Sequence, residues 1–246
     1  MNPTATMGRP VEMSPETRAR LAGGLLLITM VGGGFAQGFV AGRLIVPGDA
    51  AATAHNILTH EPLFRLGFAV YLVEMACQIA MTVLFYELLK PASRTGSALA
   101  AVFGLVGCTI KTLARLFFFA PLLVLGGAGY LSVFDPKQLH ALAFFSLRVN
   151  YTVETIAMVF FGLNTLVTGY LVFRSTFLPK ALGVVSVVAG FGWLLYLYEP
   201  LALRLESWIV GTGVIGALAM VLWLLVKGVD ERRWNEQAGR TIAPIA

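Results

Sequence analysis

The sequence predicts an all-α membrane protein, a bundle of six transmembrane helices with both termini in the cytoplasm. The first observation is composition: 57% of the 246 residues are hydrophobic and 13% are charged, whereas charged residues make up about a quarter of soluble domains. The second is that the apolar residues fall into separate runs, each long enough for a helix to cross the bilayer. The third is that Lys and Arg gather in alternate loops. The first two observations exclude a soluble domain.

The chain divides into a disordered cytoplasmic leader at 1–20, a transmembrane domain at 21–227 and a cytoplasmic tail at 228–246. Its formal net charge of +5 lies mostly in short loops, where helix orientation and anionic lipid account for it. We therefore expect membrane lipid as a partner and no nucleic acid. The six expected spans cover residues 21–40, 63–89, 97–125, 136–173, 181–198 and 208–226.

The first span is rich in glycine, and Gly34, Gly38 and Gly42 recur every four residues. Small residues at this spacing let another helix approach closely. We expect a packing face inside the bundle, and the alternative is the contact of a homo-oligomer. After this span, Asp49 follows a Pro-Gly turn and can cap a short surface helix over 49–58.

The second span carries polar side chains at helical spacing, so that they share one face. These residues are Tyr71, Glu74, Gln78 and Thr82.

The third span carries two cations, Lys111 and Arg115, in an otherwise apolar run. They are four residues apart and therefore share a helix face with Gly104 and Cys108. A cation at membrane depth costs about 2.5–3.5 kcal/mol on insertion scales, so acidic side chains of neighbouring spans should compensate both. Pro121 is expected to kink or end this span, with a glycine-rich exit loop at 126–129.

The fourth apolar segment is longer than a bilayer requires, so it projects outward, tilts or begins with a separate short helix before Arg148. It carries Arg148, Tyr151 and Glu154, with amides at Asn150 and Asn164. The fifth and sixth spans meet at a turn whose aromatic residues can anchor the membrane interface. These are Trp193, Tyr198 and Trp208.

The orientation follows from the loops. Eleven of the eighteen Lys and Arg residues lie in the leader, in the links at 90–94 and 174–180, and in the tail together with the adjoining Lys227. The alternate loops hold four, diluted by acidic residues. The positive-inside rule then places both ends in the cytoplasm, as in a multi-pass protein of the plasma membrane.

Several stretches resemble a known family. They are Arg43-Leu-Ile-Val-Pro-Gly-Asp-Ala-Ala-Ala-Thr-Ala with His55-Asn56, Phe64-Arg65-Leu-Gly-Phe68, the segment 84–91, Phe134-Asp135-Pro136 with Gln138, and the segment 160–179 that begins Phe160-Phe161-Gly162-Leu163. Over about residues 21–190 the chain is similar to the bacterial integral-membrane family known as domain of unknown function 4386. The resemblance implies a multi-helix bacterial membrane protein and transfers no catalytic residue.

Opposite charges from three spans are expected at similar depth. At about 1.5 Å per helical residue from the basic loops, Glu74 and Lys111 lie about 24–26 Å deep, and Arg115 and Glu154 about 30–32 Å, in a core about 30 Å thick. We expect a Glu74–Lys111 pair, with Glu154 near Arg115 or Arg148. One positive charge remains, and an anion can compensate it.

The first functional hypothesis is a non-enzymatic protein that binds or moves a small anionic or amphipathic ligand in an outward-facing polar pocket. The alternative is a structural or signalling partner protein, since buried ion pairs also fix which helix faces meet. A lipid-acting enzyme ranks last, because no nucleophile or metal set accompanies the glutamates. The candidate ligand-binding residues are Glu74, Gln78, Lys111, Arg115, Arg148, Tyr151 and Glu154.

No metal or cofactor is expected. His55 and His60 are five residues apart and therefore lie on different helix faces, and His140 is remote in sequence. Cys77 and Cys108 lie inside spans, so we interpret them as free buried thiols.

Overall fold

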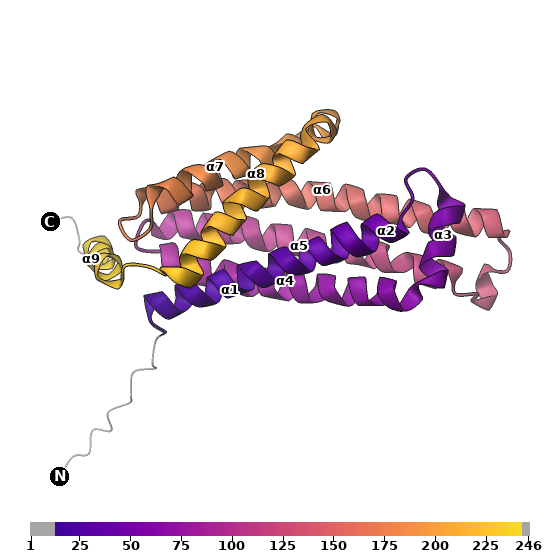
Figure 1. The fold of residues 1–246 in the computed structure, drawn as a ribbon, viewed down its shortest axis with the longest axis horizontal. Helices are drawn as coiled ribbons and strands as arrows, with labels where there is room; N and C mark the ends of the chain where they lie inside the picture. Colours follow the sequence, from indigo (N-terminus) through magenta and orange to yellow (C-terminus); the bar gives the residue numbers. More distant parts are fainter. Residues whose placement is uncertain (1–12, 243–246) are drawn as a thin grey trace, which may run out of the picture.

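The computed structural model describes residues 13–242, which form helices and connecting turns without a strand (Figure 1). Within this range six helices are long and apolar enough to cross a membrane. The predicted all-α fold with six spans is confirmed. The spans are Pro15–Leu44, α4 (Glu61–Leu89), α5 (Arg94–Leu125), α6 (Pro136–Arg174), α7 with its 3-10 extension (Lys180–Leu197) and α8 (Glu199–Val226).

The first span begins earlier than its hydropathy suggests. Ser14 caps α1 (Pro15–Gly33) by accepting a hydrogen bond from the Thr17 N–H at 3.2 Å, and Pro15 occupies the first turn. Residues 15–20, expected in a disordered leader, are therefore helical. Residues 1–12 of that leader lie outside the described part of the chain.

The connection after the first span folds as predicted. Asp49 caps α3 (Ala50–Thr59), with its Oδ1 accepting from the Ala52 N–H at 2.9 Å. The short helix packs against α5 and α6 at the end of the bundle far from the start of α1 (Figure 1). His55 on this helix is exposed, and the Nδ1 of His60 lies 3.1 Å from the Asn56 carbonyl oxygen.

Two long helices are continuous at positions where the sequence suggested that a helix could end. α5 continues through the buried Pro121 to Leu125, so that proline does not end the span. α6 is one continuous helix of 39 residues, which rules out a separate short helix before Arg148. A capping box starts α6, because Asp135 and Gln138 each accept from the backbone N–H of the other.

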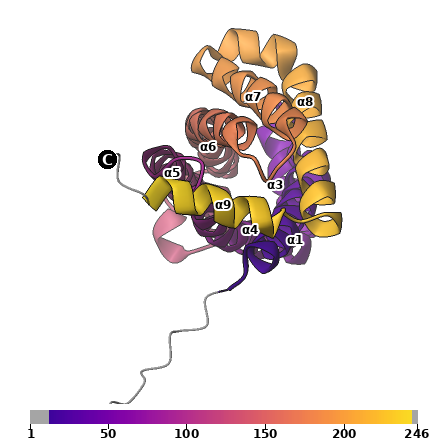
Figure 2. The same ribbon diagram turned by 90° about the vertical axis from the view of Figure 1, so that its left-hand side faces the viewer.

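The six spans pack in chain order as a closed ring. Each span contacts the next, and α8 returns to α1. Figure 2 shows this arrangement from the end of the bundle. Gly23 closes the ring, since a Cβ at this position would lie 2.9 Å from the Cβ of Leu224 on α8.

The glycine stripe does not pack inside the bundle, which corrects the expectation from spacing. Residues Gly34–Ala41 form a π-helical stretch, in which a four-residue spacing no longer aligns side chains. A Cβ at Gly34 or Gly38 would meet nothing within 4 Å, and Gly42 is also exposed. A homo-oligomer through Gly34, Gly38 and Gly42 stays a prediction.

The closest helix packing lies between α6 and α7 instead. A Cβ at Gly183 would lie 2.5 Å from the Phe173 backbone nitrogen and 2.7 Å from the Gly169 carbonyl oxygen. Gly162 and Gly190 face each other in the same way, with the Gly190 oxygen 3.1 Å from a Cβ at Gly162. These glycines let the two backbones touch.

The C-terminal tail contains a helix that hydropathy does not predict, α9 (Glu231–Ile242). It crosses the end of the bundle (Figure 2). The Trp234 Nε1 donates to the Leu88 carbonyl at 2.9 Å, and the Glu231 Oε1 accepts from the Glu16 N–H at 3.1 Å. The starts of α1 and of α9 therefore lie at the same end, as an even number of spans requires.

We expect Gly183→Ala to lower the free energy of unfolding by about 1–3 kcal/mol, because the new methyl group meets the backbone of α6. The matched control is Gly211→Ala in α8, whose Cβ would have open space. Thermal unfolding of both variants in lipid nanodiscs checks this. Equal stability of the two variants would refute the close α6–α7 packing.

Candidate functional site

One face of α4 carries the polar side chains of the site. Tyr71, Glu74 and Thr82 are 1%, 4% and 5% exposed, and Gln78 is half-buried. The helical period turns all four toward the middle of the bundle, as predicted.

The predicted pair between Glu74 and Lys111 is present. The Lys111 Nζ lies 2.7 Å from the Glu74 Oε1, and the two side chains are 12% and 4% exposed. Gly33 of α1 provides the space, since a Cβ there would lie 3.3 Å from the same oxygen. Pairing removes the cost of placing either charge alone inside a membrane.

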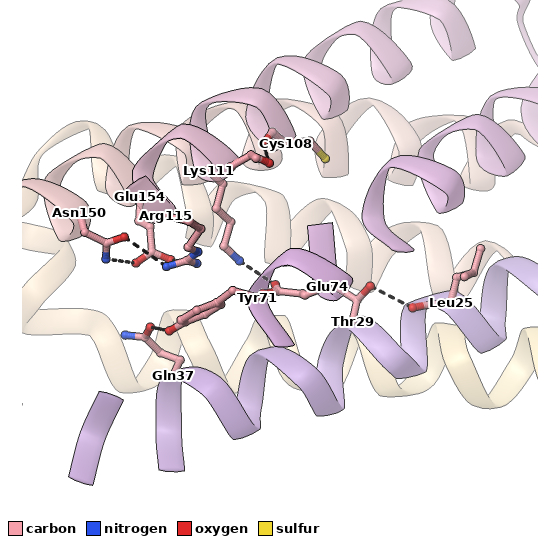
Figure 3. A network of polar contacts seen from close by, with 11 residues as sticks. Leu25, Thr29, Gln37, Tyr71, Glu74, Cys108, Lys111, Arg115, Asn150 and Glu154 are labelled. Atoms are coloured by element: carbon pink, nitrogen blue, oxygen red, sulfur yellow. Dashed lines mark hydrogen bonds and ion pairs between the residues drawn. The ribbon is translucent and has the colours of Figure 1, made fainter. Parts of the chain in front are cut away.

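Arg115 is held by α6 in a second polar cluster, which we call the Arg115 network (Figure 3). Its Nη2 lies 2.5 Å from the Glu154 Oε1, and its Nη1 donates to the Asn150 Oδ1 at 3.3 Å. The Asn150 amide also donates to the Glu154 Oε2 at 3.0 Å. Of the two partners considered for Glu154, the structure therefore selects Arg115, which is 1% exposed.

The network extends to the π-helical stretch of the first span (Gly34–Ala41) through an aromatic ring. The Arg115 Cζ lies 3.4 Å from the centroid of the Tyr71 ring, a cation–π contact. The Tyr71 hydroxyl donates to the Gln37 Oε1 at 2.5 Å. Gln37 is not among the residues predicted for the site, although a lone amide inside an apolar, glycine-rich span was an available signal.

Arg148 is the cation left over, and it lies apart from this site. Its side chain is exposed, and its Cζ lies 5.6 Å from the Tyr151 ring. Among residues 13–242 it has no carboxylate within 4 Å. The expected uncompensated positive charge is therefore Arg148, outside the bundle's interior.

A cavity of about 360 Å³ occupies the middle of the ring and is lined by side chains from all six spans. Of the predicted binding residues, Glu74, Gln78 and Lys111 line it, whereas Arg115, Arg148, Tyr151 and Glu154 do not. Most of the remaining surface is apolar or hydroxylic. Trp193, expected as an interfacial anchor, lines this cavity as well, while Tyr198 and Trp208 are exposed.

The cavity extends from the ion pair toward α9. On α4 its lining runs from Glu74 to Phe85, and on α6 from Met158 to Thr168. Both stretches lie on the α9 side of the Arg115 network. That network therefore stands between the cavity and the α3 end, where an outward opening was expected.

The pair leaves hydrogen-bonding capacity free at the cavity wall. The Glu74 Oε2 is buried and has no partner among the described residues. Within the same residues, the Lys111 ammonium, which has three N–H donors, donates to the Glu74 Oε1 alone. Both residues line the cavity, so this free hydrogen-bonding capacity lies next to it.

Metal-binding side chains do not gather within residues 13–242, where no group of three His, Cys, Asp or Glu residues could hold an ion. Both cysteines are free, and Cys108 is buried while Cys77 is half-buried.

We expect Arg115→Leu to lower the free energy of unfolding by about 3–5 kcal/mol, because it leaves Glu154 charged and nearly buried without its partner. The double variant Arg115→Leu/Glu154→Leu should regain most of this loss. Arg148→Leu is the control and should change stability by no more than about 0.5 kcal/mol, since Arg148 is exposed. Chemical denaturation in detergent micelles measures all three. The pairing would be refuted if Arg115→Leu were as mild as Arg148→Leu.

Comparison with known proteins agrees with the resemblance noted in the sequence. The model of the family described as Domain of unknown function (DUF4386) matches residues 21–228. Comparison with curated proteins and with solved structures gives no match. The matched region includes residues of all six spans and every residue of the site, so the chain belongs to the DUF4386 family.

Proposed function

We propose that this multi-pass membrane protein binds a small amphipathic ligand in its central cavity, with the polar end of the ligand at Glu74 and Lys111. The observation that carries this proposal is a cavity inside the six-helix ring whose wall holds a buried ion pair with one unpartnered carboxylate oxygen. An ion pair serving packing alone has no need of a cavity beside it.

The size and lining of the cavity support a small guest with an apolar body. Its volume of about 360 Å³ falls in the range of about 300–1,000 Å³ typical of small-molecule sites. At about 30 Å³ for each water-sized group, it holds about a dozen non-hydrogen atoms. Five methionines line it, and their flexible thioethers adapt to varied apolar shapes. They are Met30, Met75, Met81, Met158 and Met220.

The predicted binding residues divide into three roles under this proposal. Glu74, Gln78 and Lys111 contact the ligand. Arg115 and Glu154 hold α5 to α6 beside the cavity. Arg148 and Tyr151 lie outside it and take no part in binding.

We also propose that the protein lies in the bacterial plasma membrane with both ends in the cytoplasm. Support comes from the end of the bundle that carries α9, because the links at 90–94 and 174–180 lie there. These links, the leader and the tail hold most of the Lys and Arg residues, as the positive-inside rule requires of a cytoplasmic side.

A second function is favoured by the Arg115 network. This network joins four spans, lies off the cavity and has most of its hydrogen bonds made within the protein. Such an arrangement suits a structural or signalling membrane protein whose ion pairs only hold the bundle. In that case no small ligand affects stability through the cavity.

The test is thermal unfolding in nanodiscs with three ten-carbon probes: decan-1-ol, decanoate and decyltrimethylammonium. At least one probe should raise the unfolding temperature of the wild type. At a probe concentration of a hundred times its Kd, the gain in the free energy of unfolding is about 2.7 kcal/mol. Ala217→Trp fills the cavity wall and should abolish the effect. Leu218→Trp is the control, since Leu218 faces outward with 41% of its surface exposed.

Two results would count against binding in the cavity. One is that no probe raises the unfolding temperature of the wild type, which favours the structural alternative. The other is an equal response of Ala217→Trp and Leu218→Trp, which places the effect at the lipid-facing surface.

A further inference from the structure

We propose that the cavity takes a neutral amphiphile from within the bilayer, whose head group both donates and accepts a hydrogen bond, as a long-chain alcohol does. This inference rests on the proposed function and names the class of its ligand. Of the anionic and the amphipathic ligand predicted from the sequence, it selects the amphipathic one.

The charge balance of the cavity argues for a neutral head group. Glu74 and Lys111 are the charged residues in its lining, and their side chains neutralise each other at 2.7 Å. A guest with a net charge would leave one charge without a partner in a largely apolar surrounding, which is strongly unfavourable. The surplus cation that was expected to attract an anion, Arg148, is exposed elsewhere.

The free hydrogen-bonding atoms define the head group further. The buried Glu74 Oε2 lacks a donor among the described residues, and the Lys111 ammonium has donors to spare. A hydroxyl group satisfies both, by donating to the carboxylate oxygen and accepting from the ammonium. An ether can only accept, so it would leave the carboxylate oxygen unsatisfied, which costs free energy in a buried site.

Buried apolar side chains lie beyond both ends of the cavity along the bundle axis. Toward α9 they include Leu88, Leu171 and Leu224. A side pocket of about 10 Å³ also lies on this side, next to Thr82, and it has room for no more than about one water. Toward α3, the Arg115 network is followed by a second apolar cluster that includes Phe64 and Phe118. A guest that entered along the axis would have to pass these apolar side chains.

The side of the ring between α1 and α8 is the route that remains. The two helices pack closely at Gly23, near the α9 end, and α8 then runs diagonally away from α1 (Figure 1). Cavity-lining residues lie on both helices where they separate, with Met30 and Gly33 on α1 and Gly213 on α8. This side faces the hydrocarbon, so a guest that enters here must dissolve in lipid, which again favours a neutral amphiphile.

The experiment measures displacement of tritiated decan-1-ol from the protein in nanodiscs at about pH 8, with protein-free nanodiscs as background. The unlabelled competitors are decan-1-ol, methyl decyl ether, decanoate and decyltrimethylammonium. Decanoate is ionised at this pH. All four are compared at equal mole fraction in the membrane. We expect decan-1-ol to compete at about tenfold lower mole fraction than any other, since the others lose a hydrogen bond or add a charge.

A second variant separates the head-group contacts from the cavity itself. Glu74→Leu/Lys111→Leu keeps the cavity neutral while removing both hydrogen-bonding groups. In this variant decan-1-ol and methyl decyl ether should compete equally. Ala217→Trp should show no displaceable binding of decan-1-ol.

Each other outcome overturns the inference. If decanoate or decyltrimethylammonium competes as well as decan-1-ol, the site takes a charged head group. If the ether competes as well as the alcohol in the wild type, the Glu74 oxygen is not a contact. If decan-1-ol shows no displaceable binding while decanoate still stabilises the wild type and not Ala217→Trp, the neutral class is wrong and the proposed function survives. If Ala217→Trp binds and responds to every probe as the wild type does, both this inference and the proposed function are wrong.

Discussion

The structure depends on the compensation of two cations that one helix carries into the membrane. Lys111 and Arg115 lie one turn apart on α5, yet they use carboxylates from different neighbours, Glu74 on α4 and Glu154 on α6. A charge inside a bilayer is tolerated only when its partner is held in place. The two pairs therefore fix which faces of α4, α5 and α6 meet, and the rest of the ring closes around them.

The two pairs differ in what surrounds them, and this difference gives them different roles. Arg115 is enclosed by the Tyr71 ring and by Asn150 and Glu154, so its charge is used within the protein. Each pair keeps one buried atom without a partner among the described residues, the Arg115 Nε in one and the Glu74 Oε2 in the other. Glu74 and Lys111 line the cavity, whereas Arg115 and Glu154 do not. One pair therefore lies within packed helices and the other beside an open space.

The charge pairs could be predicted from sequence because two simple quantities decide them. The helical period puts Lys111 and Arg115 on one face, and the rise per residue puts Glu74 and Glu154 at matching depths. The helix caps at Asp49 and Asp135 are equally local, since a side chain and the backbone two or three residues away form them.

The remaining features depend on distances between segments, which no local pattern reports. The π-helical stretch turns Gly34 and Gly38 out of the bundle, while Gly33, outside the four-residue stripe, supports Glu74. α9 is too polar for a hydropathy search, and it is attached by Trp234 to a carbonyl of α4. The position of the cavity depends on side chains from six helices together, so it follows from the packing of the whole ring.

The most direct test of this account is solid-state NMR on protein in bilayers with 15N at the Lys111 side chain and 13C at the Glu74 carboxyl group. The account predicts an ionised carboxylate with strong dipolar coupling to the Lys111 nitrogen, and a carboxylate chemical shift that changes when decan-1-ol is added. A weak coupling, or a shift that stays the same at saturating decan-1-ol, would contradict it.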